Sequence, residues 1–501
     1  NNNNSNTCPK DTLSVCVVCV STGVLPAHHM SVLARVLRGH GPAFVAPAGS
    51  ISILQQPRDL LHHIRQGIGS ASQRVVLASL YLGTGPAEQE IVDEVEQACR
   101  RSPGLQVTLL FDYFRGTRCV GHERQSSLAL AQRLVDKYPS QVKAFFFQTP
   151  HLQGLLSKLL PPRYNESFGV QHMKIYLFDD DMLFTGANLS DWYFVNRQDR
   201  YMEVRGCAPL ADFHQRLVQE ICQVSHAVIP SKGLQGASIP SVRPPLPLQW
   251  SALGRRIHSL WEEYQQRTAE EMEELYAQGS VDESGIPNHG ALVVPTIQLS
   301  AAGIRHDEET TVQLLEWAAS QKKQGHLILA SAYFNITQRY ADILLTKFSS
   351  TSVDILTSSP RCNGFWGGSG ISKFIPHCYS FLERRFFNRL PHRTDICLYE
   401  YDRPDWTFHA KGLWWTPTTP NQGEQSDVHI TLIGSANLGR RSCERDLEAQ
   451  VVVITRDPSL QEALSQEHRS MMSSARLVKD QVFQEPHRKV PLWVRVVTRI
   501  I

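Results

Sequence analysis

Two short stretches of the sequence each place a histidine and a lysine two positions apart. His172 and Lys174 form the first pair, and His409 and Lys411 form the second. Side chains two positions apart in a strand point to the same face, so each stretch is expected to present an imidazole beside an ammonium group at a strand end. An imidazole can attack phosphorus or move a proton near neutral pH, and an ammonium group can hold phosphoryl oxygens. Two such pairs facing each other would form a two-histidine phosphoryl-transfer site.

An asparagine closes a turn of small residues after each pair. Asn188 ends Gly-Ala-Asn in the first copy, and Asn437 ends Gly-Ser-Ala-Asn in the second, where Ser435 is a further candidate ligand. The amide of such an asparagine can donate to a phosphoryl oxygen. A lone His-x-Lys occurs by chance in many chains. Two copies that are each followed by the same asparagine turn, within a duplicated pattern of strands and helices, are a specific signal.

Carboxylates further along each copy are candidates for orienting the histidines. A carboxylate that accepts from the second imidazole nitrogen fixes the tautomer of the ring. We assign this role to Asp199 in the first copy and Asp446 in the second, with Glu203 and Glu448 as the alternatives.

The first half of the chain alternates between strand and helix patterns. Residues 75–83 form a continuous apolar run, which is typical of a strand buried on both faces. This alternation predicts an α/β fold with a parallel or mixed sheet. The expected strands are 75–83, 107–111, 142–147, the His172 stretch and 182–185, and the expected helices are 57–66, 88–101 and 128–137.

The second half repeats this pattern. Residues 327–334 match 75–82, with Tyr333 aligned on Tyr81. The repeat predicts two like domains related by a pseudo-twofold axis, with the two histidines on opposite walls of one cleft. The expected elements are a strand at 291–299, a helix at 309–323, and strands at 327–334, 353–356 and 396–401.

Breaks in the pattern define the expected domains. The apolar residues of the stretch 1–48 show no sustained periodicity, and this stretch is expected to form a disordered tail. A proline-rich stretch at 240–247 separates an N-terminal domain, 49–247, from a C-terminal domain, 248–501. A charged helical pattern at 250–278 begins the second domain and is expected to bridge the two.

The composition narrows the classes of function. Net charge is +2 over 501 residues, so nucleic acid is not expected as a partner. No apolar run reaches the roughly 18 residues that span a bilayer. Of the 11 cysteines only Cys16 and Cys19 are closely spaced, so neither a zinc site nor a disulfide framework is expected.

The motifs resemble those of a known superfamily. The two His-x-Lys copies match the HxK(x)4D…GSxN signature of the phospholipase D superfamily, and the stretches HMKIYLFD, GANLSDWYFVNRQDRY, FHAKGLWW and RDLEAQ extend the resemblance to one of its families. From about residue 50 to the C-terminus the chain is similar to the mitochondrial phosphatidylglycerophosphate synthases. The resemblance implies two phospholipase D-like domains, each a mixed sheet flanked by helices. It also implies transfer of a phosphatidyl group from CDP-diacylglycerol to sn-glycerol 3-phosphate, with release of CMP, at the matrix side of the mitochondrial inner membrane.

The resemblance implies a role for each motif residue. His172 is expected to attack phosphorus and form a phosphatidyl-histidine, and His409 to take the proton of the acceptor hydroxyl. Lys174 and Lys411, with the two asparagines, would hold the phosphoryl oxygens. Because two lysines supply positive charge, no metal and no other cofactor is expected.

One position departs from the signature. The first copy has Asp179 at the signature aspartate, whereas the second has Thr416 there. This puts an aspartate role in the second half in doubt. The first copy is the more complete one, which favours His172 as the nucleophile and Asp179 as part of the catalytic set.

Several further residues are candidates for substrate or membrane contact. Arg115, between Asp112 and Arg118, follows a strand and can hold the glycerol phosphate, although a solvated loop fits equally well. Tyr81 and Tyr333 are expected to line the cleft. Residues 152–160, 364–370 and 492–501 combine apolar or aromatic residues with glycine or basic residues, which suits peripheral contact with a membrane. Core packing, with the C-terminal stretch as a strand, or a mobile loop is the alternative.

Two other functions remain compatible with the same motifs. A phospholipase D-type phosphodiesterase would use water as the acceptor and would hydrolyse phospholipid or nucleic acid. A catalytically dead lipid-binding protein is the other alternative, raised by Thr416. The sequence leaves the oligomeric state open.

Overall fold

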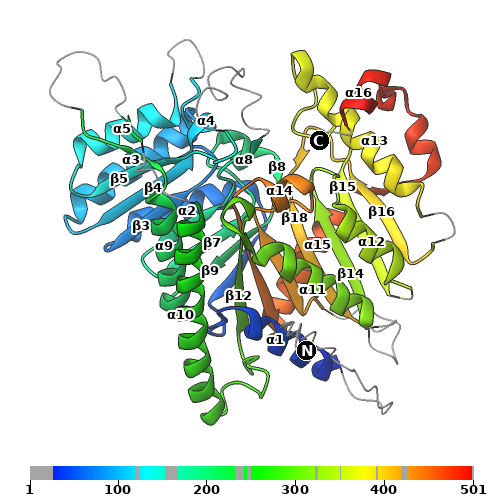
Figure 1. The fold of residues 1–501 in the computed structure, drawn as a ribbon, viewed down its shortest axis with the longest axis horizontal. Coiled ribbons are helices and arrows are strands. Elements are labelled where there is room, and N and C mark those ends of the chain that lie inside the picture. Colours follow the sequence, from blue (N-terminus) through cyan, green and yellow to red (C-terminus); the bar gives the residue numbers. More distant parts are fainter. Residues whose placement is uncertain are drawn as a thin grey trace, which may run out of the picture.

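Two mixed sheets, one from each half of the chain, lie side by side with helices packed against them (Figure 1). The computed structural model describes residues 26–119, 125–152, 168–231, 242–244, 250–321, 325–349, 351–390, 393–418 and 427–498. The architecture confirms the predicted α/β class and the duplication.

The sheet of the first half has the strand order β11-β10-β5-β4-β3-β6-β7-β9-β2 within the described residues. Its three central strands, β3, β4 and β5, are parallel, and β6, β7 and β9 continue the sheet antiparallel. The strands are β2 (Ile51–Leu54), β3 (Arg74–Ala78), β4 (Gln106–Asp112), β5 (Val142–Phe147), β6 (Ile175–Phe178), β7 (Asp181–Thr185), β9 (Tyr201–Val204), β10 (His226–Val228) and β11 (Val242–Arg243).

The sheet of the second half repeats this arrangement, in the order β1-β12-β20-β19-β18-β14-β15-β16-β21 with β13 beside β12. Here β14, β15 and β16 are parallel, and β18, β19 and β20 are antiparallel. The strands are β1 (Phe44–Ala46), β12 (Ala291–Leu299), β13 (Ile304–Arg305), β14 (Gly325–Ser331), β15 (Ser352–Ser358), β16 (Ile396–Tyr401), β18 (Lys411–Pro417), β19 (Ile430–Gly434), β20 (Glu448–Thr455) and β21 (Ala475–Leu477).

Helices follow the strands as the alternation predicted. In α2, for example, Leu60, Ile64 and Ile68 are four residues apart and lie buried on one face. The helices of the first half are α2 (Pro57–Ser70), α3 (Pro86–Arg101), α4 (Tyr113–Gly116), α5 (Ser127–Lys137), α8 (Asp191–Val195) and α9 (Ala208–Cys222). Those of the second half are α10 (Trp250–Ala277), α11 (His306–Ser320), α12 (Gln338–Thr346), α13 (Ile375–Phe387), α14 (Arg440–Glu444), α15 (Pro458–Met472) and α16 (Leu492–Val497), with 3₁₀ turns η2 (Ser300–Ala302), η3 (Gly370–Phe374), η4 (Asp480–Gln484) and η5 (Pro486–Arg488).

The two halves share one core. Buried apolar residues from both halves, such as Met173 and Ile433, belong to the same cluster. Arg200 of the first half reaches into the second half. There it forms a buried ion pair with Glu467 at 2.9 Å and covers the ring of Trp414 at 3.8 Å. A two-stranded parallel ribbon of β8 (Arg197–Gln198) and β17 (Thr407–Phe408) also joins the halves. The sites at the ends of the two sheets are therefore held in one rigid relation.

Two expectations about the ends of the chain need correction. Residues 26–46 are not a tail: α1 (Pro26–His40) buries Leu33 and Leu37, and β1 pairs with β12 of the second sheet. The apolar residues of α1 recur at helical spacing, a signal that the sequence reading missed. Residues 1–25 lie outside the described part. The C-terminal stretch, expected as a strand, forms helix α16 as far as it is described, and residues 153–160 of the predicted amphipathic stretch lie outside the description.

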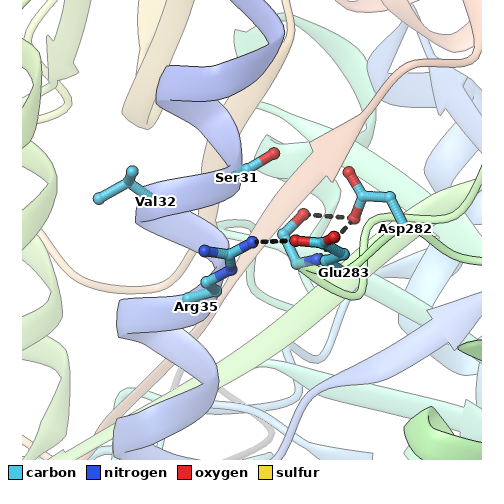
Figure 2. A pocket seen from close by; sticks show the side chains of 6 residues that line it. Ser31, Val32, Arg35, Asp282 and Glu283 are labelled. Carbon is cyan, nitrogen blue, oxygen red and sulfur yellow. Dashed lines mark hydrogen bonds and ion pairs between the residues drawn. The ribbon is translucent and has the colours of Figure 1, made fainter. Parts of the chain in front are cut away.

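A cavity of about 350 Å³ lies beside α1, away from the ends of the sheets where the two halves meet (Figures 1 and 2). Its charged groups pair with protein partners: Arg35 contacts Glu283 at 3.0 Å, and Asp282 contacts Arg456 at 2.6 Å. The first of these pairs anchors α1 to the second half. The lining residues are Ser31, Val32, Arg35, Asp282, Glu283 and Ser284.

Candidate active site

Each histidine is held by the backbone of the opposite half. The N–H of His172 donates to the carbonyl of Leu447 at 2.8 Å, and the N–H of His409 donates to the carbonyl of Gln198 at 2.7 Å. His172 lies just before β6, and His409 lies between β17 and β18, so both stand ahead of the strands in which the sequence placed them. These symmetric crossings bring the two motifs to the seam between the halves.

The carboxylates that orient the histidines also cross between the halves. Asp199 contacts Nδ1 of His409 at 2.6 Å, and Glu448 contacts Nδ1 of His172 at 2.9 Å. The assignment of Asp446 is therefore wrong, and its alternative Glu448 takes the position. Asp446 instead accepts from the backbone N–H of Val170 at 3.0 Å and pairs with Arg441. The other alternative, Glu203, contacts His63 at 3.0 Å.

The two lysines are buried and turn toward the backbone of their own histidines. Nζ of Lys174 donates to the carbonyl of His172 at 2.7 Å, and Nζ of Lys411 donates to that of His409 at the same distance. Burial lowers the pKa of Lys174 to about 7, against the opposing charge of Glu448. Burial likewise lowers the pKa of Lys411 to about 8. An anion bound between the two lysines would stabilise the protonated form of both side chains.

Burial keeps both imidazoles neutral. It lowers the pKa of His172 well below its usual value, helped by the charge of Lys174. It lowers the pKa of His409 in the same direction, helped by Lys411, Arg197, Lys174 and His172. A neutral imidazole has the lone pair that nucleophilic attack or proton abstraction requires.

The two rings differ at the nitrogen that would face substrate. Nε2 of His409 lies 3.2 Å from Nζ of Lys411 and 3.4 Å from the hydroxyl of Tyr193. Nε2 of His172 has no hydrogen-bond partner among the described residues, because its ring is held only through Nδ1. His172 therefore presents the more accessible nucleophilic nitrogen.

The motif asparagines carry unsatisfied polar atoms. Oδ1 of Asn188 and Oδ1 of Asn437 are buried and lack partners in the described part of the chain. Buried amides are almost always paired, so such atoms indicate a ligand site. Ser435 is also buried, but its hydroxyl donates to the carbonyl of Ala449, which holds β19 against β20. Gly186 has no room for a side chain, because an added Cβ would lie 2.8 Å from a carboxylate oxygen of Asp199.

Tyrosines surround His409. The ring of Tyr333 lies 5.8 Å from the His409 ring, and the ring of Tyr193 lies 5.1 Å from it, both edge to face. Tyr81 is covered by Arg115 at 4.3 Å, at the end of β4. The sequence reading missed Tyr193, although it lies within a quoted motif, because an aromatic residue in a short helix gives no chemical signal of its own.

Asp179 is not part of the site. Its carboxylate accepts from the backbone N–H groups of Ser72, Gln73 and Arg74, at 2.8–2.9 Å, at the far end of β6. Five residues of extended chain from Lys174 correspond to about 16 Å. The expectation that Asp179 is catalytic is therefore wrong, and Thr416 at the corresponding place in β18 removes no group from the site.

Comparisons with known proteins agree with this geometry. No family model matches the sequence. The crystal structure of phosphatidylserine synthase from Haemophilus influenzae superposes with a TM-score of 0.67 at 19% identity, over 94% of this chain and 97% of that one. This superposition shows the class of fold, and the two crossed imidazole–ammonium pairs within it carry the His-x-Lys motifs that resemble those of the phospholipase D superfamily.

Curated sequences narrow the class to one family. The mitochondrial CDP-diacylglycerol–glycerol-3-phosphate 3-phosphatidyltransferase of Homo sapiens is 36% identical over 488 residues, which cover 93% of this chain and 84% of the human protein. The Gallus gallus protein of that name matches equally, over 85% of its length. The Saccharomyces pastorianus 3-phosphatidyltransferase is 30% identical over 471 residues, 90% of this chain and 87% of that protein. The chain belongs to the CDP-diacylglycerol–glycerol-3-phosphate 3-phosphatidyltransferase family.

Proposed function

We propose that the protein transfers the phosphatidyl group of CDP-diacylglycerol to sn-glycerol 3-phosphate, giving phosphatidylglycerophosphate and CMP. The observation that carries the proposal is the pair of neutral, crossed histidines flanked by two buried lysines. The family supplies the identity of the substrates. The product is a precursor for phosphatidylglycerol and cardiolipin synthesis.

In the first step Nε2 of His172 attacks the phosphorus that bears diacylglycerol. A phosphorus–nitrogen bond forms, the phosphoanhydride bond breaks, and its electron pair leaves with CMP. Glu448 holds the Nδ1 proton of His172 and stabilises the charge that develops on the ring. Lys174 and Lys411 offset the charge on the phosphoryl oxygens, so the proposed chemistry draws on no metal or other cofactor.

In the second step a hydroxyl of glycerol 3-phosphate attacks the phosphatidyl-histidine. His409 takes the hydroxyl proton on Nε2 while Asp199 holds its Nδ1 proton at 2.6 Å. The phosphorus–nitrogen bond breaks, and its electron pair returns to His172. The site then holds neutral His172 and protonated His409, which passes its proton to solvent or to the next leaving group.

A product assay tests the proposal. Purified protein is incubated with labelled CDP-diacylglycerol, with and without glycerol 3-phosphate. We expect labelled phosphatidylglycerophosphate only when the acceptor is present. Phosphatidic acid as the main product in both reactions would identify a hydrolase instead, and binding without turnover would identify a lipid-binding protein.

We propose that the protein reaches its lipid substrate from a membrane surface. None of the described helices is both long and apolar enough to cross a membrane. Apolar side chains are nevertheless exposed on elements close to the site: α8, which carries Tyr193, also exposes Trp192, and the ring of Phe365 lies 5.9 Å from that of Tyr333. These elements and α16 lie in the upper part of Figure 1. We call the exposed set the apolar rim, and it comprises Trp192, Val195, Phe365, Trp366, Ile371, Leu492, Trp493 and Val496.

Exposed basic residues accompany the apolar rim. Lys373, Lys489 and Arg495 lie beside its members in the second half. Aromatic and aliphatic side chains interleaved with basic ones favour a surface that carries anionic lipid. The human and chicken relatives are named as mitochondrial, and we propose the matrix side of the inner membrane as the site of action.

A further inference from the structure

A guanidinium beside His409 has no role in the steps above. Arg197 is partly buried in β8, where its Nε donates to the hydroxyl of Thr407 at 3.0 Å and its Cζ lies 4.4 Å from the centre of the Tyr193 ring. No carboxylate of the described residues lies within ion-pair distance of it. Withdrawing a charge from water without a counter-charge costs free energy, which a bound anion would offset.

Arg197 faces the reacting centre from the His409 side. The hydroxyl of Tyr193, whose ring Arg197 covers, lies 3.4 Å from Nε2 of His409. A Cβ added to Gly364 would lie 3.2 Å from Nη2 of Arg197 and 3.4 Å from the hydroxyl of Tyr333. These two donors are therefore neighbours under the Gly364 loop. The charge of Arg197 also contributes, after burial and Lys411, to lowering the pKa of His409.

The pseudo-twofold symmetry breaks at this position. The backbone hydrogen bonds of the two histidines align the halves so that Arg197 in the first corresponds to Asp446 in the second. The His409 side of the site therefore carries a cation where the His172 side carries an anion. In-line displacement places both the leaving group and the acceptor opposite the attacking nitrogen of His172, which is the His409 side.

We propose that Arg197, with the Tyr333 hydroxyl, binds the phosphate monoester of the acceptor, sn-glycerol 3-phosphate. The proposal rests on the phosphatidyl transfer described above. The acceptor carries its phosphate three carbons from the attacking hydroxyl, and one tyrosine ring separates Arg197 from His409. A planar guanidinium binds phosphate through two parallel N–H bonds, so this subsite selects a phosphorylated alcohol.

Steady-state kinetics of Arg197→Gln, Arg197→Lys and the control Arg205→Gln test this subsite. Arg205 is exposed at the far end of β9, beside Glu203. We expect the KM for glycerol 3-phosphate to rise roughly 10- to 100-fold in Arg197→Gln and less in Arg197→Lys, because a charged hydrogen-bonded contact is lost in whole or in part. The KM for CDP-diacylglycerol should change far less. Arg205→Gln should resemble wild type.

Two results would overturn the subsite. One is a KM for glycerol 3-phosphate that stays at the wild-type value in Arg197→Gln, and the other is an equal rise in the KM of both substrates. If circular dichroism shows that the glutamine variant is unfolded, Arg197→Lys decides, since an unchanged KM there also overturns the proposal. Exchange of labelled CMP into CDP-diacylglycerol without acceptor tests the histidine intermediate separately. Absence of exchange in wild type would refute that intermediate, while the KM comparison would still test Arg197.

Discussion

The imidazoles of the site take both their backbone anchors and their carboxylate partners from the opposite half. Glu448 orients His172, and Asp199 orients His409. The His-x-Lys pairs could be recognised in the sequence because the histidine and lysine of each pair are only two positions apart. It did not show the partner of His172, because Asp446 and Glu448 are two positions apart and only the packing of the halves selects between them.

Replacing each of these two carboxylates by its amide tests the crossed arrangement. We expect Glu448→Gln to slow CMP exchange by about 10²- to 10⁴-fold, because the amide no longer holds the Nδ1 proton and the charge on His172. Asp446→Asn should slow it much less, since Asp446 contacts Val170 and Arg441 rather than the ring. Rates of CMP exchange at saturating lipid give the comparison. A larger loss in Asp446→Asn than in Glu448→Gln would contradict the crossed arrangement.

The depressed pKa values of the lysines predict the pH dependence of the first step. Burial lowers the pKa of Lys174 to about 7 and that of Lys411 to about 8, so the free enzyme loses the charge that holds phosphoryl oxygens as pH rises through this range. Because both charges are needed, the lower pKa sets the onset, and we expect kcat/KM for CDP-diacylglycerol to fall as pH rises above about 7. Arginine stays charged in this range, so Lys174→Arg should move the fall to higher pH, even with a lower maximum.

Lys143→Arg is the matched control, because Lys143 is exposed on β5. It should leave the profile in place. A fall in kcat/KM that keeps its wild-type position in both Lys174→Arg and Lys411→Arg would show that neither lysine governs it.

At the scale of elements, the strand and helix alternation fixed most of the fold. The predicted strands at 142–147 and 291–299 coincide with β5 and β12, because their apolar runs are bounded by clear turn residues. The roles of residues at the end of a motif were harder to predict. Asp179 belongs to a recognised motif, yet it lies at the opposite end of β6 from the histidine, and only the direction of the strand reveals this.

We therefore expect a substitution at Asp179 to lower the stability of the protein and not its catalytic activity. Its carboxylate accepts three backbone N–H bonds from the turn before β3, so Asp179→Asn should lower the free energy of unfolding by about 1–3 kcal/mol. Asparagine tolerates the left-handed backbone at this position, φ 51°, so backbone strain does not confuse the result. Urea unfolding measures the change, and kcat of the folded variant should stay near wild type. A large loss of kcat without loss of stability would return Asp179 to the site.

Asp180→Ala serves as the comparison for Asp179. The Asp180 carboxylate is half exposed and pairs with Arg74 at 2.8 Å. Arg74 keeps its ion pair with Asp212 in this variant, so the change should cost less than Asp179→Asn.

At the scale of the whole molecule, the apolar rim predicts membrane binding without a spanning segment. Trp366→Ser combined with Trp493→Ser should weaken co-sedimentation with vesicles that contain anionic lipid, because interfacial tryptophans and buried apolar area drive such binding. Tyr276→Ser is the control, since Tyr276 is at least as exposed as the two tryptophans, at 53%, but lies at the end of α10 in the lower part of Figure 1. Activity on a short-chain, water-soluble CDP-diacylglycerol should persist in both. Unchanged sedimentation of the double tryptophan variant would exclude the apolar rim as the docking surface.

The proposed mechanism is tested most directly by identifying the residue that carries the phosphatidyl group. Protein is mixed with CDP-diacylglycerol labelled in the diacylglycerol phosphate, quenched under conditions that preserve a phosphorus–nitrogen bond, digested and mapped by mass spectrometry. We expect label on His172 in wild type and in His409→Ala, and no label in His172→Ala. Label on His409, or CMP exchange that persists in His172→Ala, would contradict this mechanism.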